Sequence, residues 1–585
     1  MAKFDFDTLK SLENPLYHIP IEWGVSCKEN CNVRVTLLYC GDYPVGMSYH
    51  GFKIFYPLFD SIDGVCVSRA YLPSFNDYKI LKNIYDLEYS RAIKDSDLLV
   101  VTYQTELNFI GLATALKLAG LELQVEKREG PLVLVGGPAS VNPALSLVMA
   151  DAVFVGEGEK LLAMLLEEAV EKVQRFTKGS VYKDKREIFL ELLEKEPYCH
   201  HVLINPKHKS FAAQNLPVRK ALVDYTEYVP TQFVVPSCQV VQDRLTVEIN
   251  RACTRGCRFC LASFYYRPYR ALEPERVIEV VKKGIANTGY EEVGLLSLSA
   301  SDYPWIEELI NLLEKELPEG TKYSFPSLRV DTLYRIAKMK PEKMKKGGLT
   351  VAVEAGSERL RRVVNKMINL DDLMPQLEYF FKAGWKHVKL YFMIGLPTET
   401  EDDIGELISY VNELVQRFGK KNVIVNISTF VPKPFTPFEK EKFYGIEYAI
   451  DTLRRLKREL RGISLRWSDP TLSALEALLS RVDFDLASAL AEFFYSRGSY
   501  YAFEGKGIRR ESFALEEFLV SYSADVEKIF NGSKSHWHDF INLGVSPAFL
   551  EKERQKAYSG EYTIDCRERC LGCGPICGWY SSIKK

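Results

Sequence analysis

Short apolar runs alternate with longer amphipathic stretches through the first part of the chain. The runs have the length and continuity of strands that are buried on both faces. Four such strands are predicted, at residues 33–40, 98–103, 132–135 and 152–155. Helical patterns lie between them, for example at residues 107–118 (LNFIGLATALKL). Because strands that alternate with helices are typical of βαβ units, residues 1–175 are predicted to form a doubly wound parallel-sheet domain.

A second alternation of the same kind runs from about residue 241 to about residue 440. Six strands are predicted, at residues 245–250, 293–298, 323–328, 350–354, 388–394 and 423–430. Helical patterns separate them, at residues 274–286, 304–317, 370–383 and 401–418. Six β/α repeats predict a partial (β/α)6 barrel, whose active site would lie at the carboxyl ends of its strands.

The remaining two regions have weaker patterns. Residues 176–240 mix charge clusters, prolines and short apolar runs, and we interpret them as a connecting segment. Residues 441–585 carry helical periodicity, for example at 450–460 and 472–479. The sequence therefore predicts an α/β multi-domain chain with an α-rich C-terminal region.

Composition narrows the class of protein. A chain of 585 residues is too long for one hydrophobic core, and 46% hydrophobic with 26% charged residues is ordinary for a folded protein. The net charge of −2 excludes a global basic field that would attract nucleic acid. We find no apolar run long enough to span a bilayer and no signal peptide at the start. We therefore expect a cytoplasmic protein without a membrane partner.

The 13 cysteines add candidate chemistry, because spaced cysteines in a reducing compartment indicate metal or redox sites before disulfides. One group, spaced C-x3-C-x2-C directly after the first strand of the second alternation, is Cys253, Cys257 and Cys260. Another, spaced C-x3-C-x2-C-x3-C near the C-terminus, is Cys566, Cys570, Cys573 and Cys577. The other six are predicted to pack mostly as small apolar side chains. Among them, Cys27 and Cys31 form a weak candidate pair of ligands, whose role stays open.

The two cysteine groups differ in the metal centre that they can complete. Three thiolates can hold three corners of a [4Fe–4S] cluster and leave one iron open for a substrate or cofactor. Structural zinc prefers four ligands, and no fourth Cys or His follows closely after Cys260. The four C-terminal cysteines suffice either for zinc or for a complete second cluster. Because no β/α repeats follow them, we interpret this group as a structural or electron-relay site.

Residues 250–260 (NRACTRGCRFC) resemble the signature of the radical S-adenosylmethionine (AdoMet, SAM) superfamily. The resemblance implies a partial TIM barrel in which Cys253, Cys257 and Cys260 hold a catalytic [4Fe–4S] cluster. It also implies that the open iron chelates AdoMet and that the reduced cluster cleaves it to methionine and a 5′-deoxyadenosyl radical. Phe259 matches the aromatic position that packs near the adenine of AdoMet.

Further segments resemble the AdoMet-binding parts of the same superfamily. Residues 351–358 (VAVEAGSE) resemble the fourth-strand segment, which implicates Glu354 and Ser357. Residues 393–399 (MIGLPTE) resemble the fifth-strand segment near the adenine, which implicates Gly395 and Pro397. One segment departs from the pattern, because LSASD at residues 298–302 replaces the usual Gly-Gly-Glu. Ser299 and Ser301 are the candidate side chains there.

The N-terminal region resembles the cobalamin (B12)-binding domain that precedes the barrel in one branch of this superfamily. The resemblance rests on GGP at residues 136–138 and DAVFVGEGE at residues 151–159. It implies cofactor contacts from Gly136, Gly137, Pro138, Gly156, Glu157 and Gly158. Where methionine-synthase-like domains carry the axial His of Asp-x-His-x-x-Gly, residues 42–47 read DYPVGM, so we expect cobalamin without a histidine on its lower face. The alternative is an empty scaffold whose glycines only make turns.

These resemblances imply a radical SAM enzyme, and we expect a cobalamin-dependent methyltransferase that acts on an unactivated carbon. Tyr266, Arg267 and Arg270 are candidates for lining the mouth of the barrel. One alternative is a radical SAM enzyme without cobalamin that performs rearrangement, ring formation or RNA modification. Another is an iron–sulfur or cobalamin-binding sensor protein. The substrate stays open among small molecules, peptides and RNA, and an electron donor such as flavodoxin or ferredoxin is expected.

Overall fold

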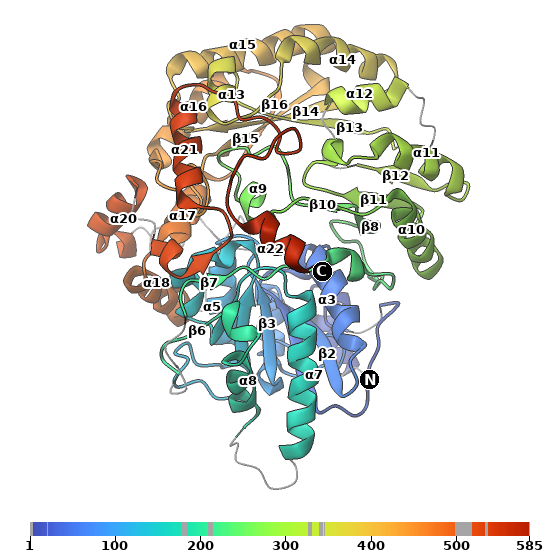
Figure 1. The fold of residues 1–585 in the computed structure, drawn as a ribbon, viewed down its shortest axis with the longest axis vertical. Coiled ribbons are helices and arrows are strands. Elements are labelled where there is room, and N and C mark those ends of the chain that lie inside the picture. The colour runs from blue at the N-terminus through green and yellow to red at the C-terminus, as the bar shows by residue number, and fades with distance from the viewer. Residues whose placement is uncertain are drawn as a thin grey trace.

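The computed structural model describes residues 4–19, 22–176, 184–208, 215–325, 330–338, 343, 345–497, 517–532 and 536–583. Figure 1 shows the N-terminal sheet with its helices at one end of the molecule and the second set of strands and helices at the other. The C-terminal segment, coloured red, crosses between these two parts. Residues far apart in the sequence therefore meet in the middle of the molecule.

The N-terminal sheet has six strands in the order β2-β1-β3-β4-β5-β6, and only β6 is antiparallel to its neighbour. The strands are β1 (Val33–Tyr39), β2 (Val65–Tyr71), β3 (Leu98–Thr102), β4 (Leu132–Gly136), β5 (Ala152–Phe154) and β6 (Val202–Ile204). All four strands predicted for this region are confirmed. The sequence analysis missed β2, which is wholly buried although it contains Ser68 and Arg69. Arg69 is tolerated inside because Glu22 and Glu88 pair with it.

Helices cover both faces of this sheet. On one face lie α3 (His50–Asp60) and α7 (Glu159–Phe176), whose apolar residues share a core with β1 and β2. On the other face, α5 (Asn108–Ala119) packs with α17 (Pro470–Arg481) and α18 (Phe484–Arg497). Two helices from the C-terminal region therefore complete the core of the N-terminal sheet.

The region interpreted as a connecting segment contributes secondary structure of its own. It contains α8 (Lys185–Leu193), the edge strand β6 and β7 (Val218–Arg219), and β7 pairs with β17 (Ile541–Asn542) near the other end of the chain. The interpretation of residues 176–240 as a simple connection is therefore wrong for these elements, because β6 hydrogen-bonds to β5.

The second part contains two parallel sheets, ordered β12-β11-β8 and β13-β14-β15-β16. The strands are β8 (Leu245–Glu248), β11 (Glu292–Leu296), β12 (Lys322–Ser324), β13 (Gly348–Glu354), β14 (His387–Ile394), β15 (Val423–Thr429) and β16 (Ser464–Trp467). Each predicted strand is found, although residues 326–328 of the third lie outside the described residues. The strand β16 was missed and extends the parallel sheet beyond residue 440.

One hydrophobic core joins these two sheets to their helices. The helices are α10 (Pro274–Thr288), α11 (Ile306–Glu316), α12 (Val330–Lys338), α14 (Leu370–Lys382), α15 (Glu401–Phe418) and α16 (Gly445–Glu459). The short helix α13 (Glu358–Val363) packs in a separate cluster with Leu396, Phe430 and Phe438. All four helices predicted for this region are present. Within the described ranges, no helix combines the length and apolar character that a bilayer crossing requires.

A glycine inside α5 sets how closely this helix approaches β1. A Cβ atom added to Gly111 would overlap the Cys40 carbonyl oxygen and lie 2.7 Å from the Cys40 Cβ. Gly405, inside α15, has only the flexible end of Arg455 nearby, at 3.9 Å. The two glycines therefore differ in packing although both lie inside helices.

We expect Gly111→Ala to lower the melting temperature, because the overlap with Cys40 outweighs the gain in helix propensity of about 1 kcal/mol. Gly405→Ala is the matched control. It should gain helix propensity without an overlap, and its melting temperature should equal or slightly exceed that of the wild type. Thermal unfolding followed by circular dichroism tests both variants. Equal stabilisation by the two substitutions would contradict the close approach of α5.

Candidate functional site

A cavity of about 370 Å³ lies where the carboxyl ends of the N-terminal strands face β8 and the short strand β9 (Asn250–Arg251). Its walls include the six residues that the sequence analysis assigned to cobalamin, which are Gly136, Gly137, Pro138, Gly156, Glu157 and Gly158. Apolar side chains from β1, β3, β4, α3 and α7 line its inner part. The structure thus brings both glycine-rich turns to one cavity, which we call the first cavity.

The glycines of the first cavity have different roles. A Cβ atom on Gly137 would lie 2.6 Å from the Tyr103 carbonyl oxygen, and one on Gly156 would overlap the Ala221 backbone. Both residues also have a positive φ, so the packing of the chain itself requires glycine there. At Gly136 an added Cβ atom would lie 3.6 Å from the Phe154 carbonyl oxygen, an ordinary van der Waals contact, so this position of the wall tolerates a Cβ atom.

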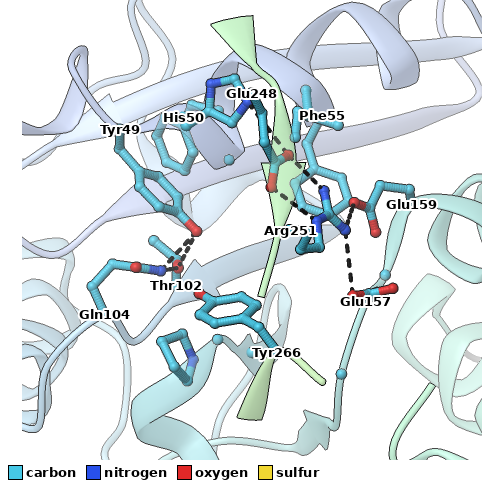
Figure 2. A pocket seen from close by; sticks show the side chains of 18 of the residues that line it. Tyr49, His50, Phe55, Thr102, Gln104, Glu157, Glu159, Glu248, Arg251 and Tyr266 are labelled. Atoms are coloured by element: carbon cyan, nitrogen blue, oxygen red, sulfur yellow. Dashed lines mark hydrogen bonds and ion pairs between the residues drawn. The ribbon is translucent and has the colours of Figure 1, made fainter. Parts of the chain in front are cut away.

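An arginine joins the two sides of the first cavity. Arg251 lies 2.8 Å from Glu159, 3.0 Å from Glu248 and 3.6 Å from Glu157, and Figure 2 shows it among these carboxylates. Arg270 adds hydrogen bonds of 2.5 and 2.7 Å to Glu157. Burial alone would raise the pKa of Glu157, but the charges of Arg270 and Arg251 hold this pKa well below its usual range. Glu157 therefore stays ionised, and its ion pairs with Arg251 and Arg270 bind the N-terminal sheet to β9 and β10 (Arg270–Ala271).

Polar groups at the opposite wall come from β3 and from the start of α3. The Tyr49 hydroxyl accepts hydrogen bonds from Thr102 at 3.1 Å and from Gln104 at 2.7 Å (Figure 2). The His50 Nε2 lies 3.8 Å from a Glu248 oxygen. Burial lowers the pKa of His50 to about 4, so the imidazole is neutral at pH 7.

Some polar atoms of the first cavity lack a protein partner. Within the described part of the chain, no hydrogen bond reaches either ring nitrogen of His50, the Oε2 atom of Glu159 or the Oδ1 atom of Asn250. Buried polar atoms of native proteins normally have partners. The oxygens of Glu159 and Asn250 accept hydrogen bonds, so they suit a ligand that presents N–H or O–H donors.

A second cavity, of about 1170 Å³, lies at the carboxyl ends of β11 and β13. Cys253, Cys257 and Cys260 line it, and the loop that carries them runs from β9 to α9 (Leu261–Tyr265). The turn uses Gly256 at a φ of 69°, where only glycine is free of strain. The first cysteine group therefore faces one large cavity, as its position after the first strand predicted.

The three cysteines of this loop are half-buried. Burial raises the pKa of Cys253 to about 11 and that of Cys257 to about 12. Across the described ranges, no three His, Cys, Asp or Glu side chains are grouped as ligands around a single metal ion. Thiols converge when they lose their protons to a metal, and a cluster of four irons holds them farther apart than one ion does.

Three of the seven residues assigned to AdoMet line the second cavity, which are Phe259, Ser299 and Glu354, whereas Ser301 does not. Glu354 pairs with Lys366 at 3.2 Å. Ser357, Gly395 and Pro397 are outside the lining. The Ser357 hydroxyl donates to Asp403 and accepts from the Leu360 N–H at 3.1 Å, so it caps α13.

One side chain lines both cavities. Leu298, in the segment that replaces Gly-Gly-Glu, is part of both walls and is 45% exposed. An apolar side chain with this exposure in a wall between two cavities indicates that the cavities adjoin.

Other predicted site residues take different places. Tyr266 lines the first cavity, whereas Arg267 and Arg270 lie outside both linings. Cys566 and Cys573 are half-buried, and Cys570 and Cys577 are exposed. Cys31 forms a disulfide with Cys66, which corrects its assignment as a filler or a ligand beside Cys27. The sequence analysis missed this pair because the two residues meet only when β2 lies beside β1.

The sequence analysis also missed most of the charged network of the first cavity. Glu248 and Arg251 flank the end of an otherwise apolar strand, directly before the first cysteine group. Charged residues at the carboxyl end of a buried strand were the available signal. Glu159, which pairs with Arg251, lies 92 positions away from it, so the pairing follows only from the tertiary structure.

Two family models match the chain. The model described as "Radical SAM proteins, N-terminal" matches residues 51–198, and "Radical SAM superfamily" matches residues 247–411. These matches bear out the resemblance in the cysteine loop.

Related proteins match larger parts of the chain. An uncharacterised protein of Methanocaldococcus jannaschii is 29% identical and covers 73% of this chain and 86% of its own length. A tRNA-2-methylthio-N(6)-dimethylallyladenosine synthase of Thermotoga petrophila is 24% identical, over 52% of this chain and 68% of the relative. Among solved structures, the radical S-adenosylmethionine methyltransferase TsrM of Kitasatospora setae, with cobalamin and a [4Fe–4S] cluster bound, has a TM-score of 0.46 and 13% identity. It covers 69% of this chain and 76% of that one.

The lowered pKa of His50 predicts a pH-dependent stability. The unfolded chain binds this proton near pH 6.5 and the folded chain near pH 4, so acidification through this window favours unfolding. The His50→Gln side chain is neutral at every pH. Between pH 7 and pH 4 the free energy of unfolding of this variant should therefore fall less than that of the wild type, with a difference of at most about 3 kcal/mol. Melting temperatures at each pH measure the effect.

The control is His200→Gln, on the surface, which should reproduce the wild-type slope. If His50→Gln also keeps the wild-type slope, His50 is not held neutral by burial.

Proposed function

Because the chain carries radical SAM superfamily domains, we propose that it is a radical SAM enzyme that binds cobalamin and methylates an unactivated carbon. The observation that carries this proposal is the shared wall of the two cavities at Leu298. A ligand at the end of the N-terminal sheet would adjoin the cavity that the first cysteine group faces. This is the arrangement that a reaction with two cofactors requires.

The second cavity fits a [4Fe–4S] cluster with AdoMet. Cys253, Cys257 and Cys260 supply thiol ligands from one wall, and three thiolates leave one iron open. A volume of about 1170 Å³ is at the upper end for ligand sites, which leaves room for AdoMet beside a substrate. We propose that these three cysteines are the cluster ligands.

The AdoMet contacts that we propose are Phe259, Ser299 and Glu354, which all line this cavity. Glu354 adopts a φ of 70°, and Lys366 pairs with its carboxylate. Ser357 and Gly395 would act by positioning the chain, since Ser357 binds Asp403 and the Gly395 N–H donates to Glu399 at 2.6 Å. Pro397 follows in the same turn.

The first cavity fits part of cobalamin. Its inner part is apolar, and the unpartnered oxygens of Glu159 and Asn250 suit the amide N–H groups around a corrin ring. A whole corrinoid is larger than 370 Å³, so it would also occupy part of the adjoining cavity. When bound, the cluster supplies the electron that cleaves AdoMet, and cobalamin supplies the methyl group. Leu298 and Tyr266 would then exclude water between the two sites.

A second candidate is a radical SAM enzyme that modifies RNA without cobalamin. A relative named as a tRNA methylthio synthase favours it. The charges of the second cavity count against RNA, because acidic side chains in its lining outnumber basic ones and RNA is an anionic substrate. The acidic residues are Glu354, Glu358, Asp371 and Asp372, and the basic ones are Arg255, Arg361 and Lys366. Retention of cobalamin distinguishes the two candidates.

The radical SAM reaction predicts release of 5′-deoxyadenosine. The anaerobically reconstituted protein, given dithionite and AdoMet, should form this product, and Cys257→Ala should reduce it to background. Cys199→Ala, which changes a cysteine outside both groups, is the control and should keep wild-type activity. Chromatography of the quenched mixture measures the product. Its absence from wild-type protein with verified cluster content would favour the sensor alternative.

Cobalamin binding predicts that filling the first cavity displaces it. Gly136→Leu adds a large side chain to the cavity wall at a position where the Cβ atom itself meets no overlap, so corrinoid retained after desalting should fall by about tenfold or more. Gly136→Ala should retain the corrinoid. The visible spectrum after incubation with hydroxocobalamin measures retention. A wild-type protein that retains none would overturn the cobalamin part of the proposal.

A further inference from the structure

The C-terminal cysteine segment lies directly against the loop of the first cysteine group. The Cys566 N–H donates to the Thr254 carbonyl oxygen at 3.3 Å, and the Thr254 hydroxyl donates to Asp565 at 2.8 Å. Thr254 follows Cys253 immediately in the sequence. The two cysteine groups, about 310 residues apart in the chain, are therefore in contact through their backbones.

Ion pairs stabilise the contact between the C-terminal segment and the first cysteine loop. The buried carboxylate of Asp302 binds Arg255 at 2.5 Å and Arg567 at 2.9 Å, and Arg567 also binds Asp565 at 2.8 Å. Arg258, fully buried in the cysteine loop, donates to the Glu561 carbonyl oxygen at 2.8 Å. Such a set of paired charges fixes the segment in one position.

Among the described residues, no carboxylate forms an ion pair with the buried Arg267, which lies between the two groups. Arg267 is 5% exposed, and its Nε donates to the Ser263 carbonyl oxygen at 3.0 Å. Among the residues that the structure describes, none hydrogen-bonds to its Nη2. This guanidinium also lies over the rings of Phe264 and Phe549, with Phe549 at 5.7 Å.

The unpartnered side of Arg267 lies against the first cysteine loop. Its Nη2 lies 3.5 Å from the position of a Cβ atom on Gly256, in the first cysteine loop. Phe549, over whose ring Arg267 lies, packs in the same apolar cluster as Leu571 and Cys573 of the C-terminal segment. A buried cation without a partner is costly, so an anionic centre is expected beside it.

We propose that Cys566, Cys570, Cys573 and Cys577 bind a second, thiolate-ligated metal centre whose negative charge Arg267 balances. Four thiolates around a zinc ion or a [4Fe–4S] core of charge +2 leave a net charge of about −2. The centre is docked on the first cysteine loop through Thr254 and Asp565. This inference does not depend on the proposed methyl transfer or on cobalamin.

The test isolates the second centre by removing the first set of ligands. The full chain with Cys253→Ala, Cys257→Ala and Cys260→Ala, purified anaerobically, should hold about one zinc or about four irons with sulfide per chain. Adding Cys573→Ala should remove this metal, whereas adding Cys199→Ala should not. Elemental analysis measures the content and tells zinc from iron.

X-ray absorption of the metal in the three-cysteine variant gives an independent readout, with sulfur ligands expected. The inference would be overturned if the three-cysteine variant held only background metal, equal to that of the same protein with Cys573→Ala added. Both proteins must show the wild-type circular dichroism spectrum for this comparison. Bound metal without sulfur ligands would also overturn the inference. Because this variant lacks the first cluster ligands, failure of the proposed enzyme activity leaves the result unaffected.

Arg267 is a positioning residue in this proposal, and two substitutions test its charge. In the same background, Arg267→Gln should make the reduction potential of an iron–sulfur centre more negative, or speed zinc release to a chelator by about tenfold. Arg267→Lys should stay close to wild type in either measurement. If Arg267 acted only through packing, Arg267→Gln and Arg267→Lys would lower the melting temperature by the same amount. Identical potentials or release rates for the two would overturn the role of Arg267.

Discussion

The structure depends on the ion pairs between Arg251 and three carboxylates at the meeting edge of two sheets. Arg251 comes two residues before Cys253, while Glu157 and Glu159 follow the last parallel strand of the N-terminal sheet. Removing one partner from such a buried set leaves an uncompensated charge, which typically costs about 3–5 kcal/mol. These pairs therefore hold the first cavity and the first cysteine loop in a fixed relation, and both proposed cofactor sites follow from that relation.

The same edge explains why a segment from the far end of the chain is needed. Parallel sheets present loops at their carboxyl ends, and loops alone bury little apolar surface. The C-terminal segment adds Phe549 and Leu550 against Phe264, directly after the first cysteine group. Tyr562 from the same segment lines the second cavity. The C-terminal segment thus packs against the residues that follow the first cysteine loop and forms part of the wall of the second cavity.

Local patterns in the sequence predicted the strands and helices of both alternations, because burial and period are properties of neighbouring residues. They failed at β2, where Arg69 is buried only because Glu22 and Glu88 reach it from other segments. The cysteine loop could be placed from its position after a strand. The Arg251 network, the disulfide of Cys31 and the shared wall at Leu298 could not, because each joins residues that only the folded chain brings together.

The contact between Thr254 and Asp565 also has a consequence in time. Translation at about 5–20 residues per second delivers Asp565 about 15 to 60 s after Thr254. During that interval the first cysteine loop has left the ribosome but its covering segment has not been made. If Cys253, Cys257 and Cys260 hold the proposed cluster, iron and sulfide delivered in this interval would reach a loop that Asp565 does not yet cover. Synthesis of Asp565 then makes the contact with Thr254 possible.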